Sequence, residues 1–205
     1  EPTAEQQIAS AFVNDIGITS AIFPAEALSE KQAGLYGGLP GGGSPELDES
    51  ALENVVFYIR TLAIPARRDW EQPEVLKGKE LFNKTACTSC HRPEMTTKKN
   101  ITPGYLAGQT IRPYTDLLLH DMGEGLADNR PDGDADGNEW RTAPLWGIGL
   151  QKTVSKHTFF LHDGRARSIE EAILWHGGEA EKAKSNFKAL KKKDRELVIR
   201  FIESL

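Results

Sequence analysis

The chain has 205 residues, of which 39% are hydrophobic and 27% are charged, and its formal net charge is −5. This length suits one sizeable domain, or one domain with an appendage, and the composition excludes a disordered, collagen-like or coiled-coil chain. No apolar run approaches the roughly 20 residues that a membrane span needs. The acidic balance argues against a nucleic-acid binder, and two cysteines are too few for a disulfide scaffold.

The sequence begins at Glu1, without a methionine or a charged-then-apolar leader. We therefore expect that a signal peptide is either absent or already removed. The same start is compatible with the cut end of a longer protein.

Two segments near the beginning of the chain have helical patterns. Thr3 is followed by Gln6 at capping-box spacing, which predicts a helix over about residues 4–14. A Gly/Pro-rich stretch at 37–47 indicates a linker or surface loop. Apolar residues at helical spacing then predict a helix over about 50–63.

Three further helices are expected later in the chain. Pro73 precedes a helical pattern over 74–84, a capping box at 168–171 begins a helix that ends at the glycines 177–178, and a last apolar stripe covers 192–204. Residues 92–167 are rich in Gly, Pro, Asp and Thr, without a convincing strand pattern. A stretch this long without regular structure is unusual unless something such as a large cofactor organises it.

Cys87 and Cys90, with His91, form the C-x-x-C-H pattern by which c-type haem is attached. Two thiols about one helical turn apart can each bond a vinyl group of the haem, and the adjacent histidine can then ligate the iron. A thioredoxin-like dithiol would need a βαβ setting, and a zinc site would need further Cys or His at ligand spacing. Neither is evident, so the pattern favours one covalent haem c.

The surroundings of the motif indicate the fold. Small c-type cytochrome domains pack the helix before the motif against a C-terminal helix. Here Gly78 and Phe82 lie in the first of these helices, and Leu197 and Phe201 lie in the second. We expect Gly78 to allow the two helices to approach closely. The predicted fold class is mainly α: a cytochrome c-like helical domain with long loops wrapped around the haem.

The second axial position of the iron has several candidates. They are His120, His157, His162, His176, Met95 and Met122, besides water or no ligand. Met95 is too close to His91 to reach the other side of the ring, and His162 lies in a turn suited to hydrogen bonding. His176, at the end of a capped helix, is favoured on these grounds, and His120 is the next choice. A surface histidine with no such role stays the alternative for each.

Three segments resemble the di-haem oxidoreductase family, whose members are often labelled thiol oxidoreductases and which is related to bacterial di-haem cytochrome c peroxidases and MauG. They are residues 111–128, 139–147 and 161–180. The resemblance covers nearly the whole chain. It implies two haems per full protein, whereas this sequence has one C-x-x-C-H. The chain therefore resembles the C-terminal part of the family, with the first haem half missing.

The resemblance has implications for the site and the domains. The related peroxidases have a methionine ligand, and MauG a tyrosine, at the position that matches His176, so the resemblance implies that His176 ligates the iron. Residues 1–70 are then a helical segment that is a remnant of, or a linker from, the missing half. Residues 71–205 are the haem domain.

Two smaller signals concern ligands. Asp132, Asp134 and Asp136 resemble the beginning of a calcium loop, but the twelfth position is Ala143, where an EF-hand needs a glutamate. A solvated acidic turn is the simpler interpretation, and a bound Ca²⁺ the alternative. Arg141 and Arg165 are candidates for binding haem propionates, or they are surface arginines.

The lysines of residues 182–193 are interpreted as a solvated helix face or as a basic docking face. The favoured function is single-electron transfer through a bis-histidine haem, as part of a di-haem oxidoreductase. The alternative is a peroxidase-type or thiol-oxidising haem enzyme with a displaceable sixth ligand. We expect a periplasmic or exported protein, since c-type haem is attached outside the cytoplasm, and as partner a redox protein or the missing haem domain. The substrate cannot be read from the sequence.

Overall fold

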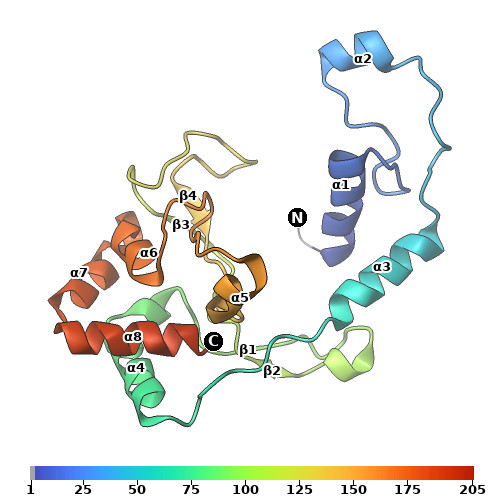
Figure 1. Ribbon diagram of the computed structural model, residues 1–205. Helices are drawn as coiled ribbons and strands as arrows, with labels where there is room; N and C mark the ends of the chain where they lie inside the picture. Colours follow the sequence, from blue (N-terminus) through green and yellow to red (C-terminus); the bar gives the residue numbers. More distant parts are fainter. Residues whose placement is uncertain (1–2) are drawn as a thin grey trace. The chain divides into compact units, whose positions relative to one another are not determined.

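The structure is a computed structural model that describes residues 3–205. The chain divides into two compact units, Glu1–Ala63 and Ile64–Leu205, which we call unit 1 and unit 2. The described residues contain eight α-helices and four strands of two or three residues each, so the protein is mainly helical (Figure 1). None of the described helices is long and apolar enough to cross a membrane.

Unit 1 contains the helices α1 (Ala4–Ile16), α2 (Glu30–Tyr36) and α3 (Glu49–Thr61). α1 begins as predicted, because the Thr3 side chain accepts a hydrogen bond from the Gln6 amide. α1 packs against α3 through a small core of Ala9, Leu52 and Val56. The sequence analysis missed α2, which buries none of its residues.

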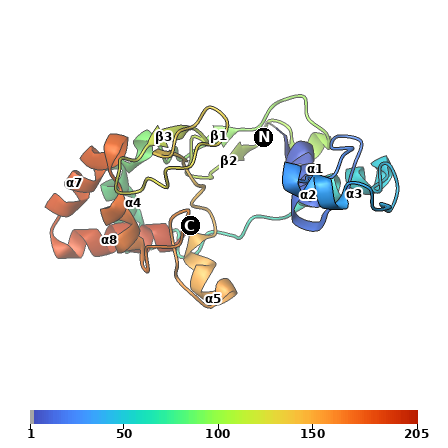
Figure 2. The same ribbon diagram turned by 90° about the horizontal axis from the view of Figure 1, so that it is seen from above.

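Unit 2 is organised around the pair α4 (Pro73–Lys84) and α8 (Lys192–Glu203), which cross closely (Figure 2). A Cβ atom added to Gly78 of α4 would lie 2.8 Å from the Phe201 Cβ of α8, closer than real contacts allow. The expectation that Gly78 permits close approach is therefore confirmed. The remaining helices of the unit are α5 (Gln151–Ser155), α6 (Ile169–Trp175) and α7 (Glu181–Ala189).

The core of unit 2 joins residues far apart in the sequence. Its buried members are Val75, Leu81, Phe82, Tyr114, Leu145, Ile169, Phe187, Val198, Phe201, Ile202 and Leu205. The helices supply most of these side chains, while Tyr114 and Leu145 come from the long irregular stretch. Ile148 and Phe160 of the same stretch also pack against this core, so the stretch is tied to it at several points.

The middle of the chain contains four short strands, which the sequence analysis did not predict. β1 (Met95–Thr96) pairs with β2 (Thr110–Ile111), and β3 (Leu119–Asp121) pairs with β4 (Glu139–Arg141), both antiparallel. Pairs this short have no room for an alternating pattern, which explains why the sequence did not reveal them. The second pair sets His120 opposite Trp140.

Candidate functional site

Unit 2 encloses one large cavity beside the C-x-x-C-H turn, with a volume of about 340 Å³. Apolar side chains make up much of its lining, among them Phe82, Leu126, Leu145, Ile148, Phe160, Ile169, Ile173 and Ile202. Cys87, Cys90, His91 and His176 line the same cavity. A concave, mostly apolar space with a few convergent polar groups is the usual form of a cofactor site.

Cys87 and Cys90 lie in a short turn that begins directly after α4. The turn Cys87–Ser89 is a 3-10 helix, and Ala86 before it has a left-handed backbone with φ of 68°. Burial raises the pKa of the Cys87 thiol. Burial, followed by the charges of Asp116 and Glu179, raises the pKa of Cys90 as well. Redox dithiols and zinc ligands need a stabilised thiolate, so these surroundings disfavour both alternatives.

His91 is fixed by one hydrogen bond to the backbone. Its Nδ1 atom lies 2.9 Å from the Tyr114 carbonyl oxygen. A carbonyl only accepts, so Nδ1 carries the proton and Nε2 keeps its lone pair. Burial lowers the pKa of His91 to about 4, against the opposing effect of the Tyr114 hydrogen bond. The ring is thus neutral at pH 7, which is the form that binds a metal.

His176 has the same arrangement on the other side of the cavity. It is the C-cap residue of α6, and its Nδ1 atom donates to the Ala172 carbonyl oxygen, 2.8 Å away. Burial lowers the pKa of His176 also, so that Nε2 of a neutral ring is free to bind. In most metal sites the second nitrogen of a ligating histidine donates in this manner.

The two imidazoles lie at a distance suited to a shared metal. Their ring centroids lie 6.5 Å apart, with 45° between the ring planes. Two imidazoles that bind one metal through nitrogen bonds of about 2.0 Å would place their centroids about 6.3 Å apart. The cavity, the cysteine pair and this spacing therefore fit a haem c that Cys87 and Cys90 would attach and that His91 and His176 would ligate.

His120, the other histidine favoured from the sequence, has both ring nitrogens engaged. Nδ1 lies 2.9 Å from a Glu179 oxygen, and Nε2 lies 2.9 Å from an Asp116 oxygen. The Glu179 hydrogen bond is the main reason that the pKa of His120 is raised. A protonated ring has no lone pair to offer, so His120 is a poor iron ligand in this conformation.

Cys90, Asp116 and His120 also form a group in which potential ligand atoms lie within 4.8 Å of one another. It is the one such group of three or more His, Cys, Asp or Glu side chains within residues 3–205. The loop with Asp132, Asp134 and Asp136 does not form one, and calcium stays a prediction. The Cys90 group lacks a stabilised thiolate, which a zinc ligand would need.

The other candidates occupy different places. Met122 lines the cavity, as does His162, whose Nε2 donates to the Arg141 carbonyl oxygen. His157 stacks on Phe159. Met95 is not part of the cavity lining.

The two arginines predicted to bind haem propionates lie in different places. Arg141 lines the cavity. Arg165 does not line it: its guanidinium donates to Asp163 and to the Gly125 carbonyl oxygen, and it lies 4.9 Å from the centroid of the Trp175 ring. These partners account for Arg165 without a propionate.

Sequence reasoning did not identify four groups that position the site. They are the carbonyls of Tyr114 and Ala172 and the carboxylates of Asp116 and Glu179. Ala172 could have been found, because it precedes His176 by four residues at the end of a helix. Tyr114 and Glu179 are distant in sequence from the histidines they contact, and no local signal points to them.

The fold is mainly helical, and its cavity brings the C-x-x-C-H motif together with His176. The whole chain, residues 1–205, matches the family model described as "Di-haem oxidoreductase, putative peroxidase", and the chain belongs to this family. The resemblance seen in the sequence is thereby confirmed. The family name implies haem and an oxidoreductase role. Neither the curated proteins nor the solved structures compared with the chain gave a match.

Proposed function

We propose that this chain is a c-type cytochrome domain that transfers single electrons within a di-haem oxidoreductase. One haem c is bound covalently through Cys87 and Cys90, and His91 and His176 ligate its iron. The observation that carries the proposal is the pair of half-buried, neutral imidazoles that line the cavity with ring centroids 6.5 Å apart.

The protein's own groups hold the two ligands in place. The carbonyls of Tyr114 and Ala172 fix the tautomers of His91 and His176, which presents both Nε2 lone pairs to the iron. The apolar lining excludes water and keeps both rings uncharged. A bound haem supplies the one-electron chemistry of iron. If His91 and His176 both ligated the iron, they would leave no ligand position for peroxide, which favours electron transfer over peroxide chemistry at this site.

The proposal includes a partner and a compartment. Since the family is di-haem and this sequence has one C-x-x-C-H, the second haem belongs to another domain or polypeptide, with which this domain exchanges electrons. Because c-type haem is attached outside the cytoplasm, we propose a periplasmic or exported location.

Covalent attachment is tested by denaturing extraction of the purified protein with acid and organic solvent. The haem should stay with the wild-type polypeptide. It should extract freely from the Cys87→Ala/Cys90→Ala variant. Thiol-reactive dye should label neither cysteine of the unfolded wild-type holoprotein. A colourless protein, or stoichiometric labelling of both cysteines, would overturn the proposal.

Reactivity with small ligands separates electron transfer from peroxidase chemistry. Cyanide and peroxide should react slowly with the oxidised wild-type protein, because His91 and His176 would both have to be ligands of the iron and neither would be easily displaced. The His176→Gly variant should bind cyanide much faster, whereas the variant His157→Gly, which alters a histidine outside the cavity lining, should match the wild type. Rapid reaction of the wild type with peroxide would favour an enzyme with a displaceable sixth ligand.

A further inference from the structure

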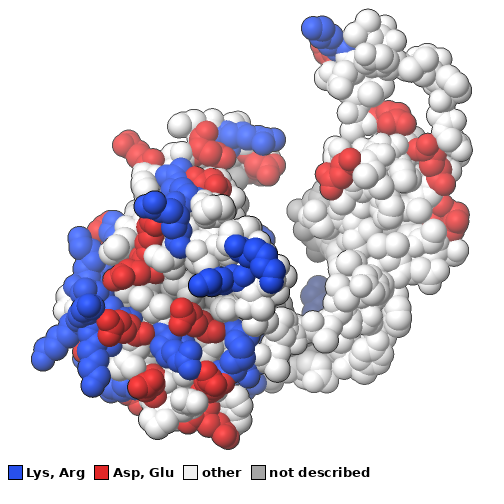
Figure 3. Space-filling view, in the orientation of Figure 1, with Lys and Arg blue, Asp and Glu red and all other residues white. Residues whose placement is uncertain are grey.

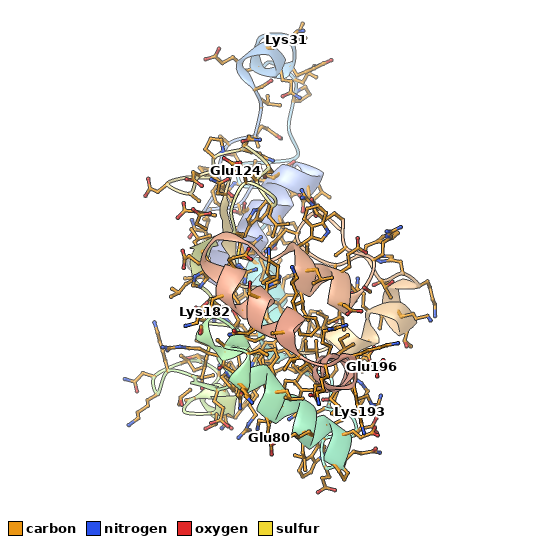
Figure 4. The ribbon with its side chains drawn as sticks, turned by 90° about the vertical axis from the view of Figure 1, so that its left-hand side faces the viewer. Lys31, Glu80, Glu124, Lys182, Lys193 and Glu196 are labelled. Carbon is orange, nitrogen blue, oxygen red and sulfur yellow. The ribbon has the colours of Figure 1, made fainter. Side chains whose placement is uncertain are left out.

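Residues 181–193, which include α7 and the start of α8, are strongly basic, although the chain as a whole is acidic. Residues 181–193 contain six lysines and a single carboxylate, Glu181. In Figure 3 many lysine and arginine side chains of unit 2 gather at the left of the view, where Figure 1 places α7 and the start of α8. Figure 4 looks onto this side, with Lys182 near the start of α7 and Lys193 at the start of α8.

Several of these lysines have no acidic partner. Lys184 pairs with Glu181 at 2.6 Å, and Lys192 approaches Glu196 at 4.0 Å. Lys182, Lys188 and Lys191 are exposed and take part in no ion pair within the described residues. We call these three residues the α7 lysine surface. Their uncompensated charge is available to attract an anionic partner.

The α7 lysine surface lies beside the site rather than on a remote face. Lys182, Ala183 and Lys184 line the cavity, so the first turn of α7 forms part of its wall. Phe187 is fully buried in the core, and the Asn186 side chain donates to the Thr85 carbonyl oxygen, two residues before Cys87. These two contacts fasten α7 to the core and to the C-x-x-C-H turn.

A short series of contacts also connects Cys90 with the beginning of α7. The Cys90 sulfur lies 3.7 Å from Nδ1 of His120, and this nitrogen lies 2.9 Å from Glu179. Glu179 belongs to the 3-10 helix Gly178–Ala180, which runs directly into α7. A partner seated at the beginning of α7 would therefore lie close to Cys90.

We propose that the α7 lysine surface docks an acidic electron-transfer protein and steers it to the Cys90 edge of the haem. This inference rests on the proposed function, because it gives the electron a place to enter or leave. Opposite charges raise the rate of encounter most at low ionic strength, without requiring a large or tight interface. Weak redox encounters fall at the low end of interface sizes.

The test uses small inorganic oxidants in place of the unidentified partner. The reduced holoprotein is mixed in stopped flow with ferricyanide, a trianion, or with tris(phenanthroline)cobalt(III), a trication. One electron passes from the ferrous haem to the reagent, leaving ferric haem and the reduced reagent. The variant Lys182→Glu/Lys188→Glu/Lys191→Glu is compared with a control of equal charge change, Lys98→Glu/Lys99→Glu/Lys152→Glu, at exposed lysines outside the cavity lining.

At low ionic strength, reversing the charge of the α7 lysine surface should slow the oxidation of the haem by ferricyanide about tenfold. The same change should accelerate its oxidation by the cobalt reagent. The control should stay within about twofold of the wild type, and the differences should shrink at high salt. Equal effects of the two triple variants would overturn the docking surface while leaving the proposed function intact. A wild-type protein without reducible haem would overturn the proposed function itself.

Anionic membranes are the competing occupant of a lysine surface. When the protein is sedimented with phosphatidylserine/phosphatidylcholine vesicles, little wild-type protein should be found with the vesicles, and no more than of the variant Lys182→Glu/Lys188→Glu/Lys191→Glu. Vesicle binding that depends on the α7 lysine surface, together with unchanged oxidation rates, would contradict an acidic protein partner.

Discussion

The cavity wall that carries His91 is built from long helices, whereas the wall that carries His176 is built from short segments. The His91 wall consists of α4, residues 85–91 and α8, and its members Phe82 and Phe201 are fully buried core residues. The His176 wall consists of the seven-residue helix α6, residues 176–180 and β3. The first wall is thus fixed by core packing, and the second by local hydrogen bonds and close backbone contacts.

This difference bears on function. A ligand placed by core packing keeps its position for as long as the domain is folded. A ligand placed by short segments depends on each local contact that orders them. We therefore expect changes in the His91 wall to lower the stability of unit 2 most, and changes in the His176 wall to lower it less and also to loosen the ligand on that side.

The largest effect is expected from Gly78→Ala in the His91 wall. The added Cβ would lie 2.8 Å from the Leu197 carbonyl carbon and from the Phe201 Cβ, so α4 and α8 would have to move apart. Overpacking of this kind should lower the free energy of unfolding by about 2–3 kcal/mol, measured by urea denaturation.

The matched control for Gly78→Ala is Gly34→Ala in α2. A Cβ at Gly34 would meet nothing within 4 Å. The gain in helix propensity should make this change neutral or slightly stabilising, by less than about 1 kcal/mol. If Gly78→Ala were equally well tolerated, close contact of α4 with α8 would not be what fixes the His91 wall.

The next largest effect is expected from Gly178→Ala in the His176 wall. Gly178 has φ of 51°, and an added Cβ would lie 2.8 Å from the Gly123 amide nitrogen. Backbone strain and the clash together should lower the free energy of unfolding by about 2 kcal/mol. The control is Gly133→Ala: Gly133 has φ of 62°, but a Cβ added there would meet nothing within 4 Å. Backbone strain alone should therefore lower its free energy of unfolding by about 1 kcal/mol. Equal losses in both variants would show that no tight contact orders the residues after His176.

A smaller, pH-dependent effect is expected from His120→Gln. The folded-state pKa of His120 is raised, mainly by its hydrogen bond to Glu179 and also by Asp116, while burial opposes the shift. Protonated His120 therefore stabilises the folded protein fully below the ordinary histidine pKa of about 6.5. This stabilisation is lost as the pH rises through the raised folded-state pKa of His120.

The measurement for His120→Gln is urea denaturation of both proteins across a pH series. Wild type should be more stable by about 1 kcal/mol in mildly acid solution, and the difference should shrink in alkaline solution. The charged groups that face His120 are Asp116 and Glu179, and Cys90 lies beside them. A difference that grows with pH would contradict a protonated His120 between two carboxylates.

The two walls also differ in how far the sequence could predict them. The His91 wall was predictable, because C-x-x-C-H is a local motif and α4 and α8 have clear apolar stripes. α7 was missed, since Phe187 is its one buried residue and the helix has no apolar stripe. His176 could be proposed from the sequence, but its distance from His91 depends on how the irregular middle of the chain packs.

His120 shows the limit most clearly. As a histidine in the loop region it was a reasonable ligand from the sequence. Its two nitrogens are taken by Asp116, four residues before it, and by Glu179, which is distant in the sequence and comes close only in the fold. Pairings of this kind depend on tertiary structure and leave no pattern in the sequence.

The central claim is that His176, and not His120, is the second iron ligand, and the EPR spectrum of the oxidised protein tests it most directly. The wild type and His120→Gly should give low-spin spectra, because both imidazole ligands remain. His176→Gly should be high-spin. An unchanged low-spin spectrum in His176→Gly, with a high-spin spectrum in His120→Gly, would contradict the account.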